Sequence, residues 1–205
     1  MGVSVIFGGQ WGSEGKGKTA LFFAKKLNAS VVVRVGGTNS GHTIVTEDGQ
    51  RLAFRILPVA SILEGVTCVL PAGSYIDVDV LEKEIQLSGI HKGLLKIHPN
   101  AVIIKKSDVL REASVGLNDK IGSTESGTGS AVISRIKRGS EVLLARDCKK
   151  LKPYLCDTID YLRDALNRSQ EVIIEGTQGF GLSLLHAKEY PYTTSRDTSA
   201  AAFVS

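Results

Sequence analysis

Short apolar runs alternate along the chain with stretches in which apolar residues recur every three or four positions. The apolar runs cover residues 3 to 7, 31 to 35, 66 to 70, 101 to 104, 141 to 145 and 171 to 175. Their length is typical of buried strands, whereas the recurring spacing is typical of amphipathic helices. This alternation predicts an α/β fold, with a mainly parallel central sheet and helices on both of its faces.

Three segments carry the helical spacing: residues 19 to 28, residues 78 to 85 and residues 157 to 166. Asp77 stands directly before the second segment and is expected to cap that helix through its carboxylate. The side chains expected to face the core are Ala20, Phe23, Ala24 and Leu27 in the first helix, Val78, Leu81 and Ile85 in the second, and Ile159, Leu162 and Leu166 in the third.

Glycine-rich polar segments follow three of the predicted strands. They are GGQWGSEGKGKT at residues 8 to 19, GGTNSGHT at residues 36 to 43 and EGTQGFG at residues 175 to 181. In a parallel sheet the carboxyl ends of the strands share one edge, and ligands bind at that edge. The three segments are therefore expected to build one site.

Residues 12 to 19 have the spacing G-x-x-x-x-G-K-T between a predicted strand and a predicted helix, which is typical of a phosphate-binding loop. Glycines allow backbone N–H groups to converge on an anion at the positive end of a helix. We therefore predict a P-loop-like nucleotide-binding core, in preference to a turn that serves packing alone. Lys16 and Lys18 would neutralise phosphoryl oxygens, and Thr19 is a candidate metal contact. Trp11 is expected to anchor the loop or the core.

The other two loops each contain one side chain with suitable chemistry. His42 lies among glycines and could donate a hydrogen bond to, or exchange a proton with, an oxygen that gains charge. Gln178 follows a strand and could accept from or donate to a ligand, although a tight turn explains its segment equally well.

Composition narrows the function classes. The 205 residues are 42% hydrophobic and 22% charged, which is ordinary for one globular domain. The net charge of +4 includes no basic block, so no nucleic-acid partner is indicated. Cys68, Cys148 and Cys156 fit neither a disulfide framework nor a zinc site and are expected to be reduced thiols. No signal sequence or membrane span is predicted, and a cytoplasmic location is expected, in the host cytoplasm if the protein is viral.

Five motifs in order resemble the adenylosuccinate synthetase family: GQWGSEGKGK, GGTNSGHT, IGSTESGTG at residues 121 to 129, EGTQG and YPYTTS at residues 190 to 195. The resemblance covers essentially the whole chain. It implies a ligase that joins L-aspartate to the 6-position of a purine nucleoside monophosphate through a 6-phosphoryl intermediate. Mg²⁺ and a nucleoside triphosphate, ATP, dATP or GTP, would be required.

The resemblance also implies roles for individual residues. Ser13, Lys16 and His42 would be catalytic, with His42 donating to the developing 6-oxyanion. The nucleotide and its phosphates would be bound by Gly12, Glu14, Gly15, Gly17, Lys18, Thr19, Gly41 and Thr43. The monophosphate substrate would be bound by Asn39, Ser123, Thr124, Gln178, Leu182, Thr194 and Arg138. Arg138 would come from a partner subunit, which implies a homodimer, and magnesium would be bound by Ser13 and the Gly41 carbonyl.

Ser13 departs from the family, whose usual aspartate there acts as general base and magnesium ligand. A viral branch with this change joins aspartate to dGMP, for 2-aminoadenine in modified DNA, and the chain resembles that branch. A serine is shorter than an aspartate, so it leaves room for the guanine 2-amino group and can accept a hydrogen bond from it. The acceptor of the N1 proton stays open between Glu14, water and phosphate.

Two further departures qualify this interpretation. Arg196 and Asp197 follow the last motif where the family has small or polar residues, and family members continue beyond residue 205. We therefore expect residues 1–205 to be the N-terminal and central part of a single, truncated domain. There are two alternatives to a ligase that acts on dGMP. One is an ordinary adenylosuccinate synthetase that uses IMP, and the other is a non-catalytic P-loop nucleotide-binding module.

Overall fold

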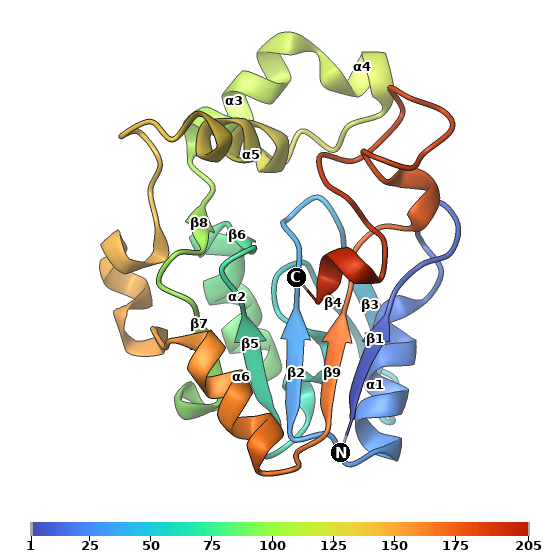
Figure 1. Ribbon diagram of the computed structural model, residues 1–205, viewed down its shortest axis with the longest axis vertical. Helices are drawn as coiled ribbons and strands as arrows, with labels where there is room; N and C mark the ends of the chain where they lie inside the picture. The colour runs from blue at the N-terminus through green and yellow to red at the C-terminus, as the bar shows by residue number, and fades with distance from the viewer. Residues whose placement is uncertain (1, 205) are drawn as a thin grey trace.

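A five-stranded parallel sheet forms the centre of the protein in a computed structural model that describes residues 2–204 (Figure 1). Its strands, in spatial order, are β1 (Val3–Ile6), β9 (Val172–Glu175), β2 (Val31–Arg34), β5 (Thr67–Leu70) and β7 (Leu95–Ile97). The four residues of β2, β5 and β9 are all buried, as expected for central strands covered on both sides. The predicted α/β class is confirmed.

Helices cover both faces of the sheet. On one face, Ala20 and Ala24 of α1 (Lys16–Lys26) and Leu81 of α2 (Val78–Ser88) belong to a core cluster with Ile173. On the other face, α6 (Thr158–Asn167) packs Ala165 into a second cluster with strand residues. Asp77 caps α2 as predicted, because its carboxylate accepts hydrogen bonds from the backbone N–H groups of Asp79 and Val80.

Two predicted core positions are wrong. Leu27 is the C-cap of α1 and is no longer in the helical conformation that would hold it on the buried face. Ile159 is 58% exposed. At about 100° per residue it lies about 120° around α6 from Ala165, the most buried apolar side chain of that helix. Tyr161 and Leu162 pack against the core instead.

The remaining elements lie outside the central sheet. β3 (His42–Val45) and β4 (Arg51–Phe54) form an antiparallel hairpin, and β6 (Tyr75–Ile76) pairs in parallel with β8 (Val102–Ile103). Three helices lie together beyond β6 and β8 (Figure 1): α3 (Lys106–Val115), α4 (Leu117–Ile121) and α5 (Thr128–Lys137). Short 3₁₀ helices cover Val59–Ile62, Lys92–Leu94, Ala145–Asp147, Lys149–Tyr154, Phe180–Leu182 and Ala201–Phe203.

The strand predicted at residues 141 to 145 does not form. Only Leu144 makes an isolated antiparallel bridge, to Val102, and a 3₁₀ helix begins at Ala145. Ala145 is nevertheless fully buried in the core. This apolar run is therefore explained by packing and not by strand pairing. The run at residues 101 to 104 yields only the two-residue strand β8, outside the central sheet.

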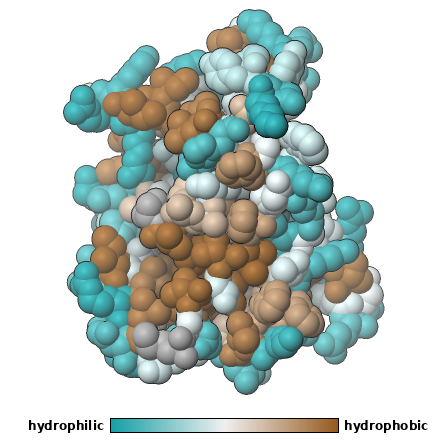
Figure 2. Space-filling model, turned by 45° about the vertical axis from the view of Figure 1, so that its right-hand side comes forward, coloured by the Kyte–Doolittle hydropathy of each residue, from teal (hydrophilic) through white to brown (hydrophobic). Residues whose placement is uncertain are grey.

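The outer side of β1 carries exposed apolar surface. Within residues 2–204, β1 pairs only with β9, and Val3 and Phe7 are nearly half exposed. Figure 2, which brings this side of the molecule forward, shows a continuous hydrophobic area. An apolar face beside an unpaired strand edge is a favourable surface for contact with other polypeptide. None of the helices in the described part of the chain has the length and hydrophobicity needed to cross a bilayer.

The three cysteines are free thiols in different surroundings, and this predicts their reactivity. Cys68 is fully buried in β5, where burial and the charge of Glu175 raise the pKa of its thiol, whereas Cys148 and Cys156 are partly exposed. Because the thiolate is the reactive form, we expect Ellman's reagent to modify two thiols rapidly and Cys68 only after unfolding. Cys148→Ser should reduce the rapid count to one. Three rapid thiols in the native protein would contradict the burial of Cys68.

Candidate functional site

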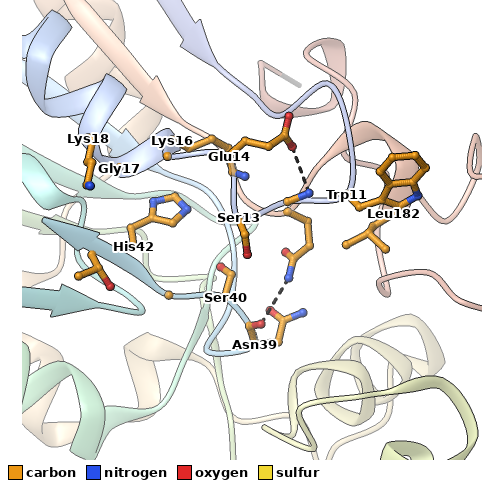
Figure 3. A pocket seen from close by; sticks show the side chains of 15 residues that line it. Trp11, Ser13, Glu14, Lys16, Gly17, Lys18, Asn39, Ser40, His42 and Leu182 are labelled. Carbon is orange, nitrogen blue, oxygen red and sulfur yellow. Dashed lines mark hydrogen bonds between the residues drawn. The ribbon is translucent and has the colours of Figure 1, made fainter.

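The three glycine-rich loops meet in one pocket of about 510 Å³ at the carboxyl end of the sheet (Figure 3). Its lining is made by Trp11, Gly12, Ser13, Glu14, Gly15, Lys16, Gly17, Lys18, Asn39, Ser40, Gly41, His42, Thr43, Gln178 and Leu182. The expectation that loops far apart in the sequence build one site is therefore confirmed. The roles assigned to these residues remain predictions.

Left-handed backbone conformations shape the loop between β1 and α1. Gly12, Ser13 and Gly15 have φ values of 93°, 54° and 77°, and α1 begins at Lys16 directly after Gly15. The Glu14 carboxylate accepts hydrogen bonds from the backbone N–H groups of Gln10 (3.0 Å) and Gly12 (3.1 Å), which closes the loop. Figure 3 shows the side chains of Glu14 and Ser13 pointing to opposite sides. Glu14 is thus engaged within the loop, which disfavours it as the base for the N1 proton.

The loop is held against the segment that follows β9. The N–H of Phe180 donates to the Gly8 carbonyl (2.8 Å), and that of Gly181 donates to the Gln10 carbonyl (2.7 Å). The two chains approach so closely that a Cβ atom on Gly179 would lie 2.4 Å from the Gln10 carbonyl oxygen. Glycine is required there by the close approach, and these contacts hold the loop between β1 and α1 in place.

Two lysines carry positive charge at one end of the pocket. Lys16 is buried, and burial lowers the pKa of its ammonium group, as does Arg34, while Glu14 opposes the shift. Lys18 is exposed but also lines the pocket. Thr19 has an exposed side chain and is not among the residues that line the pocket, so its phosphate or metal contact stays a prediction.

A buried charged group lies behind His42. Glu175, which is fully buried, is ion-paired with Arg34, and its Oε1 lies 2.5 Å from Nδ1 of His42. Its Oε2 accepts a hydrogen bond from the Val59 N–H (3.1 Å). Burial alone would raise the pKa of Glu175, but Arg34 and His42 outweigh it and hold that pKa below its usual value. Glu175 therefore remains ionised.

These contacts define what His42 can do. Burial lowers the pKa of His42, Arg34 lowers it further, and the hydrogen bond to Glu175 opposes both. Nε2 is buried and has no hydrogen-bond partner among the described residues, so a ligand atom could occupy that position. With Nδ1–H donating to Glu175, a neutral imidazole presents Nε2 as an acceptor. If Nδ1 instead accepts from Nη1 of Arg34, which lies within hydrogen-bond distance, the neutral imidazole carries its proton on Nε2 and has the donor role expected from the sequence.

Arg34 and Glu175 were missed by the sequence reasoning. The available signal was a charged residue at the end of each of two buried strands, VVVR and VIIE. The two residues are partners in the parallel register of β2 and β9, and their charges are opposite.

The other end of the pocket is neutral. Asn39, Gln178 and Leu182 line it, and Nδ2 of Asn39 donates to Oγ1 of Thr194 (3.3 Å), which brings a further predicted substrate residue near the site. Trp11 is 64% exposed and lies beside Leu182 (Figure 3), so it is not a core residue.

Four predicted substrate residues are not part of the pocket lining: Thr194, which contacts Asn39, and Ser123, Thr124 and Arg138. Ser123 and Thr124 belong to the loop between α4 and α5, where Oγ1 of Thr124 donates to Ser126 (3.3 Å). Arg138 is the C-cap of α5 and lines a separate hollow together with Arg135 and Arg146. The contact of Arg138 with the pocket of a partner subunit, which the resemblance implies, stays a prediction.

The oxygen atoms proposed to bind magnesium, from Ser13 and Gly41, fit an ion that takes most of its ligands from phosphate and water. No group of three His, Cys, Asp or Glu side chains that could hold a metal occurs in residues 2–204. The Ser13 hydroxyl and the Gly41 carbonyl are both neutral donors at the pocket wall. Because Mg²⁺ keeps several waters and takes phosphate oxygens, these donors fit a metal that arrives with a triphosphate.

Comparison with known proteins agrees with the fold and the motifs. The adenylosuccinate synthetase family model matches residues 5–145 and 140–205. The adenylosuccinate synthetases of Methanococcus aeolicus and Archaeoglobus fulgidus are 38% and 36% identical, and each match covers 100% of this chain. The matches cover 61% and 60% of those proteins, so the chain spans about 60% of the length of these curated relatives.

Two solved structures have the same fold. The succinoaminodeoxyadenylate synthetase of cyanophage S-2L, bound to dGMP and to dATP as an energy donor, superposes with a TM-score of 0.85 at 33% identity. The match covers 98% of this chain and 58% of that protein. The fully ligated adenylosuccinate synthetase of Plasmodium falciparum gives a TM-score of 0.87 at 23% identity, over 98% of this chain and 57% of the other, which shows the fold alone.

The close packing of α1 on His42 predicts the effect of one glycine substitution. A Cβ atom on Gly17 would lie 2.7 Å from Cβ of His42 and 3.0 Å from Cγ1 of Val59, which is fully buried. We expect Gly17→Ala to lower the free energy of unfolding by about 1–3 kcal/mol, because this overlap outweighs the gain in helix propensity.

Urea unfolding followed by circular dichroism measures this change. Gly9→Ala is the matched control, since no atom lies within 4 Å of a Cβ placed at Gly9 in the same loop. That variant should stay within about 0.5 kcal/mol of the unsubstituted chain. Equal stability of the two variants would show that Gly17 is not required by packing.

Proposed function

The chain belongs to the adenylosuccinate synthetase family, and on this premise we propose that it forms the phosphate- and purine-binding part of a ligase that acts on dGMP. The ligase joins L-aspartate to the 6-position of dGMP and hydrolyses a nucleoside triphosphate. Its product is 2-amino-2′-deoxyadenylosuccinate, a precursor of 2-aminoadenine in DNA.

Ser13 is the observation that carries the choice of dGMP. Its φ of 54° lies in the left-handed region, which aspartate and asparagine tolerate better than serine. The backbone therefore gives no reason for a serine at this position, and the ligand is the remaining reason. In the pocket, a short hydroxyl leaves space for the guanine 2-amino group and can accept its hydrogen bond. The similarity to the cyanophage S-2L enzyme, whose structure contains dGMP and dATP, supports this substrate and a purine triphosphate such as dATP.

The pocket residues have the chemistry that the reaction needs. Lys16, Lys18 and the loop N–H groups bind the phosphates, because they present cations and convergent donors at the start of α1. The purine 6-oxygen attacks the terminal phosphorus, forming an O–P bond as the bond to the nucleoside diphosphate breaks. His42 stabilises the charge on the 6-oxygen. The aspartate amine then attacks carbon 6, and inorganic phosphate leaves with the oxygen.

Magnesium would neutralise part of the triphosphate charge when bound, with Ser13 and the Gly41 carbonyl as its protein ligands. Glu14 is engaged by two backbone N–H groups, so water or phosphate is favoured as the acceptor of the N1 proton.

An ordinary adenylosuccinate synthetase that uses IMP is the second candidate. It is favoured by the archaeal relatives, whose names give that activity and whose identity to this chain is 36–38%. Hypoxanthine lacks the 2-amino group, so the two candidates differ in whether a purine with this group binds better.

A homodimer is part of the proposal. Ile133 and Ile136 of α5 and Leu110 of α3 are 53%, 71% and 69% exposed, and they share the helical group that ends at Arg138. Exposed apolar side chains of this size favour an interface. Pairing through this group would bring the guanidinium of Arg138 to the partner's pocket, where it could bind the 5′-phosphate.

Substitution of Ser13 tests the choice of substrate. Unsubstituted protein should bind dGMP more tightly than dIMP, measured by titration calorimetry. Ser13→Asp should lower the ratio of the two affinities by roughly ten- to a hundredfold, since the longer side chain crowds the 2-amino group and discrimination by one small group is worth about 1–3 kcal/mol. Ser13→Asn is the control that separates size from charge. If size decides, it acts like Ser13→Asp; a preference for dIMP in the unsubstituted protein would favour the second candidate.

The proposed dimer predicts that a single substitution on α5 lowers the molecular mass of the protein measured in solution. Ile136→Asp should weaken self-association by about thirtyfold or more, because a charge would be buried in the interface. Sedimentation equilibrium measures this. Leu87→Asp on α2 is the matched control, since Leu87 is also an exposed apolar helical residue, at 46%, and should leave the dimer intact. Monomeric unsubstituted protein at micromolar concentration would contradict the proposed dimer.

A further inference from the structure

A segment without regular secondary structure forms part of the neutral end of the pocket. Residues 183–200 contain no helix or strand. The N–H of Thr194 donates to the Leu182 carbonyl (2.8 Å), and the N–H of Leu184 donates to the Arg196 carbonyl (3.0 Å). Leu182 lines the pocket, and the Thr194 hydroxyl accepts a hydrogen bond from another lining residue. Two stretches of the segment thus lie side by side at the ligand site without being part of the sheet.

Asp197 is the centre of a hydrogen-bond cluster within this segment. Its carboxylate accepts from the Ser183 hydroxyl (2.9 Å), from the Ser199 N–H (3.0 Å) and from the Ser199 hydroxyl (2.8 Å). Oγ of Ser183, which is fully buried, in turn accepts from the N–H groups of Leu185 (3.2 Å) and His186 (3.3 Å). Burial would raise the pKa of Asp197, but the hydrogen bonds from Ser199 and Ser183 outweigh it and hold that pKa below its usual value. The ionised carboxylate therefore joins the two stretches to each other.

Arg196, the preceding residue, extends to a different part of the protein. Its Nη2 donates to the Gly73 carbonyl (2.9 Å), and its guanidinium carbon lies 5.9 Å from the ring centre of Tyr75, which is buried. A cation over an aromatic ring is a favourable contact. Gly73 belongs to the loop between β5 and β6, at the carboxyl end of the sheet. The segment is thus held internally through Asp197 and against the loop after β5 through Arg196.

The phosphate end of the pocket is held by different contacts. Glu14 closes the loop between β1 and α1 through the N–H groups of Gln10 and Gly12, and Gly181 donates to the Gln10 carbonyl from the other side. These contacts are made by residues that precede the segment in the chain. A change at Asp197 should therefore affect the neutral end and leave the phosphate end in place.

We propose that Arg196 and Asp197 are positioning residues that hold Leu182 and Thr194 at the neutral end of the pocket, in the arrangement that binds the nucleoside monophosphate. Neither of the two charged side chains lines the pocket, so they act through the segment and not through a contact with the ligand. A segment that is disordered in the free protein has to be ordered on binding, which lowers the affinity. A segment that is already ordered avoids this loss. The inference rests on the proposed function for the identity of the ligand.

Removal of the Asp197 carboxylate tests the proposal with two probes, dGMP and inorganic tripolyphosphate. In titration calorimetry, Asp197→Ala should weaken the binding of dGMP by roughly tenfold or more, because the segment then has to be ordered when the ligand binds. The affinity for tripolyphosphate, which would bind at the phosphate end, should stay unchanged. Arg196→Met removes the bond to Gly73 and should also weaken the binding of dGMP. Asp197→Asn can still accept through Oδ1 and donate to Oγ of Ser199, so it should keep most of the affinity.

Asp157→Ala is the matched control. Asp157 is also a carboxylate that accepts hydrogen bonds from backbone N–H groups, those of Ile159 (3.0 Å) and Asp160 (3.2 Å) at the start of α6, and it does not line the pocket. Its loss should lower the free energy of unfolding and leave the affinity for dGMP unchanged. An unchanged affinity for dGMP in Asp197→Ala, or an equal loss in Asp157→Ala, in Asp197→Asn or for tripolyphosphate, would overturn the proposal.

Hydrogen exchange without ligand separates this inference from the proposed function. In Asp197→Ala, the amide protons of Leu184 and Thr194 should exchange about tenfold faster, because the segment opens more easily. The amide proton of Gly181 should keep its rate. Unchanged rates at Leu184 and Thr194 would refute the positioning role. If dGMP does not bind the unsubstituted protein while these two rates rise, the proposed function fails and the role of Asp197 is supported.

Discussion

The ionised carboxylate of Glu175, enclosed in the protein at the end of β9, is the constraint on which the rest of the site depends. Removing a carboxylate from water costs several kcal/mol, which only close partners can offset. Arg34, its partner in the register of β2 and β9, supplies the opposite charge, and His42 and the Val59 N–H supply hydrogen bonds. A slip of one residue between these strands would send the two charges to opposite faces of the sheet. The pair therefore fixes the register, and with it the position of the loops that follow both strands.

From this group the site divides into two chemically different ends. Lys16 and Lys18 give the phosphate end its positive charge, while Asn39, Gln178 and Leu182 leave the purine end without a formal charge. At a neutral end, selection between bases has to come from shape and from the direction of hydrogen bonds. Nη2 of Arg34 lies 3.3 Å from Oγ of Ser40, and hydroxyl contacts continue from Ser40 through Thr177 to Gln178, so hydrogen bonds connect the buried ion pair to this end of the pocket.

Sequence patterns predicted the parts of this structure that depend on local chemistry. The strands β1, β2, β5 and β9, the cap at Asp77 and the three loops were readable because burial, turn residues and helical spacing lie within a few positions. β7 was not predicted, because its three residues are too few to show a hydrophobic period. Residues 141 to 145 were mistaken for a strand, because their apolar side chains pack against the core without strand pairing. The hairpin of β3 and β4 carried a usable signal, Asp48–Gly49 at its turn. The burial of the Thr177 hydroxyl had no such signal, because its partner Ser40 lies 137 positions away in the chain.

Overall sequence identity to known relatives leaves the substrate undecided, because the substrate is selected by a few side chains in the pocket. Identity of 36–38% to archaeal adenylosuccinate synthetases averages over the whole chain, and most of that chain maintains the sheet, the loop closure and the buried charges. Discrimination between purines that differ in one small group is worth only about 1–3 kcal/mol, and one or two side chains can supply it. Ser13 is such a side chain, placed where the family usually has an aspartate and held in a backbone conformation that an aspartate would adopt more easily. A residue that departs from the family against the preference of its own backbone carries more information about the ligand than the many residues that agree.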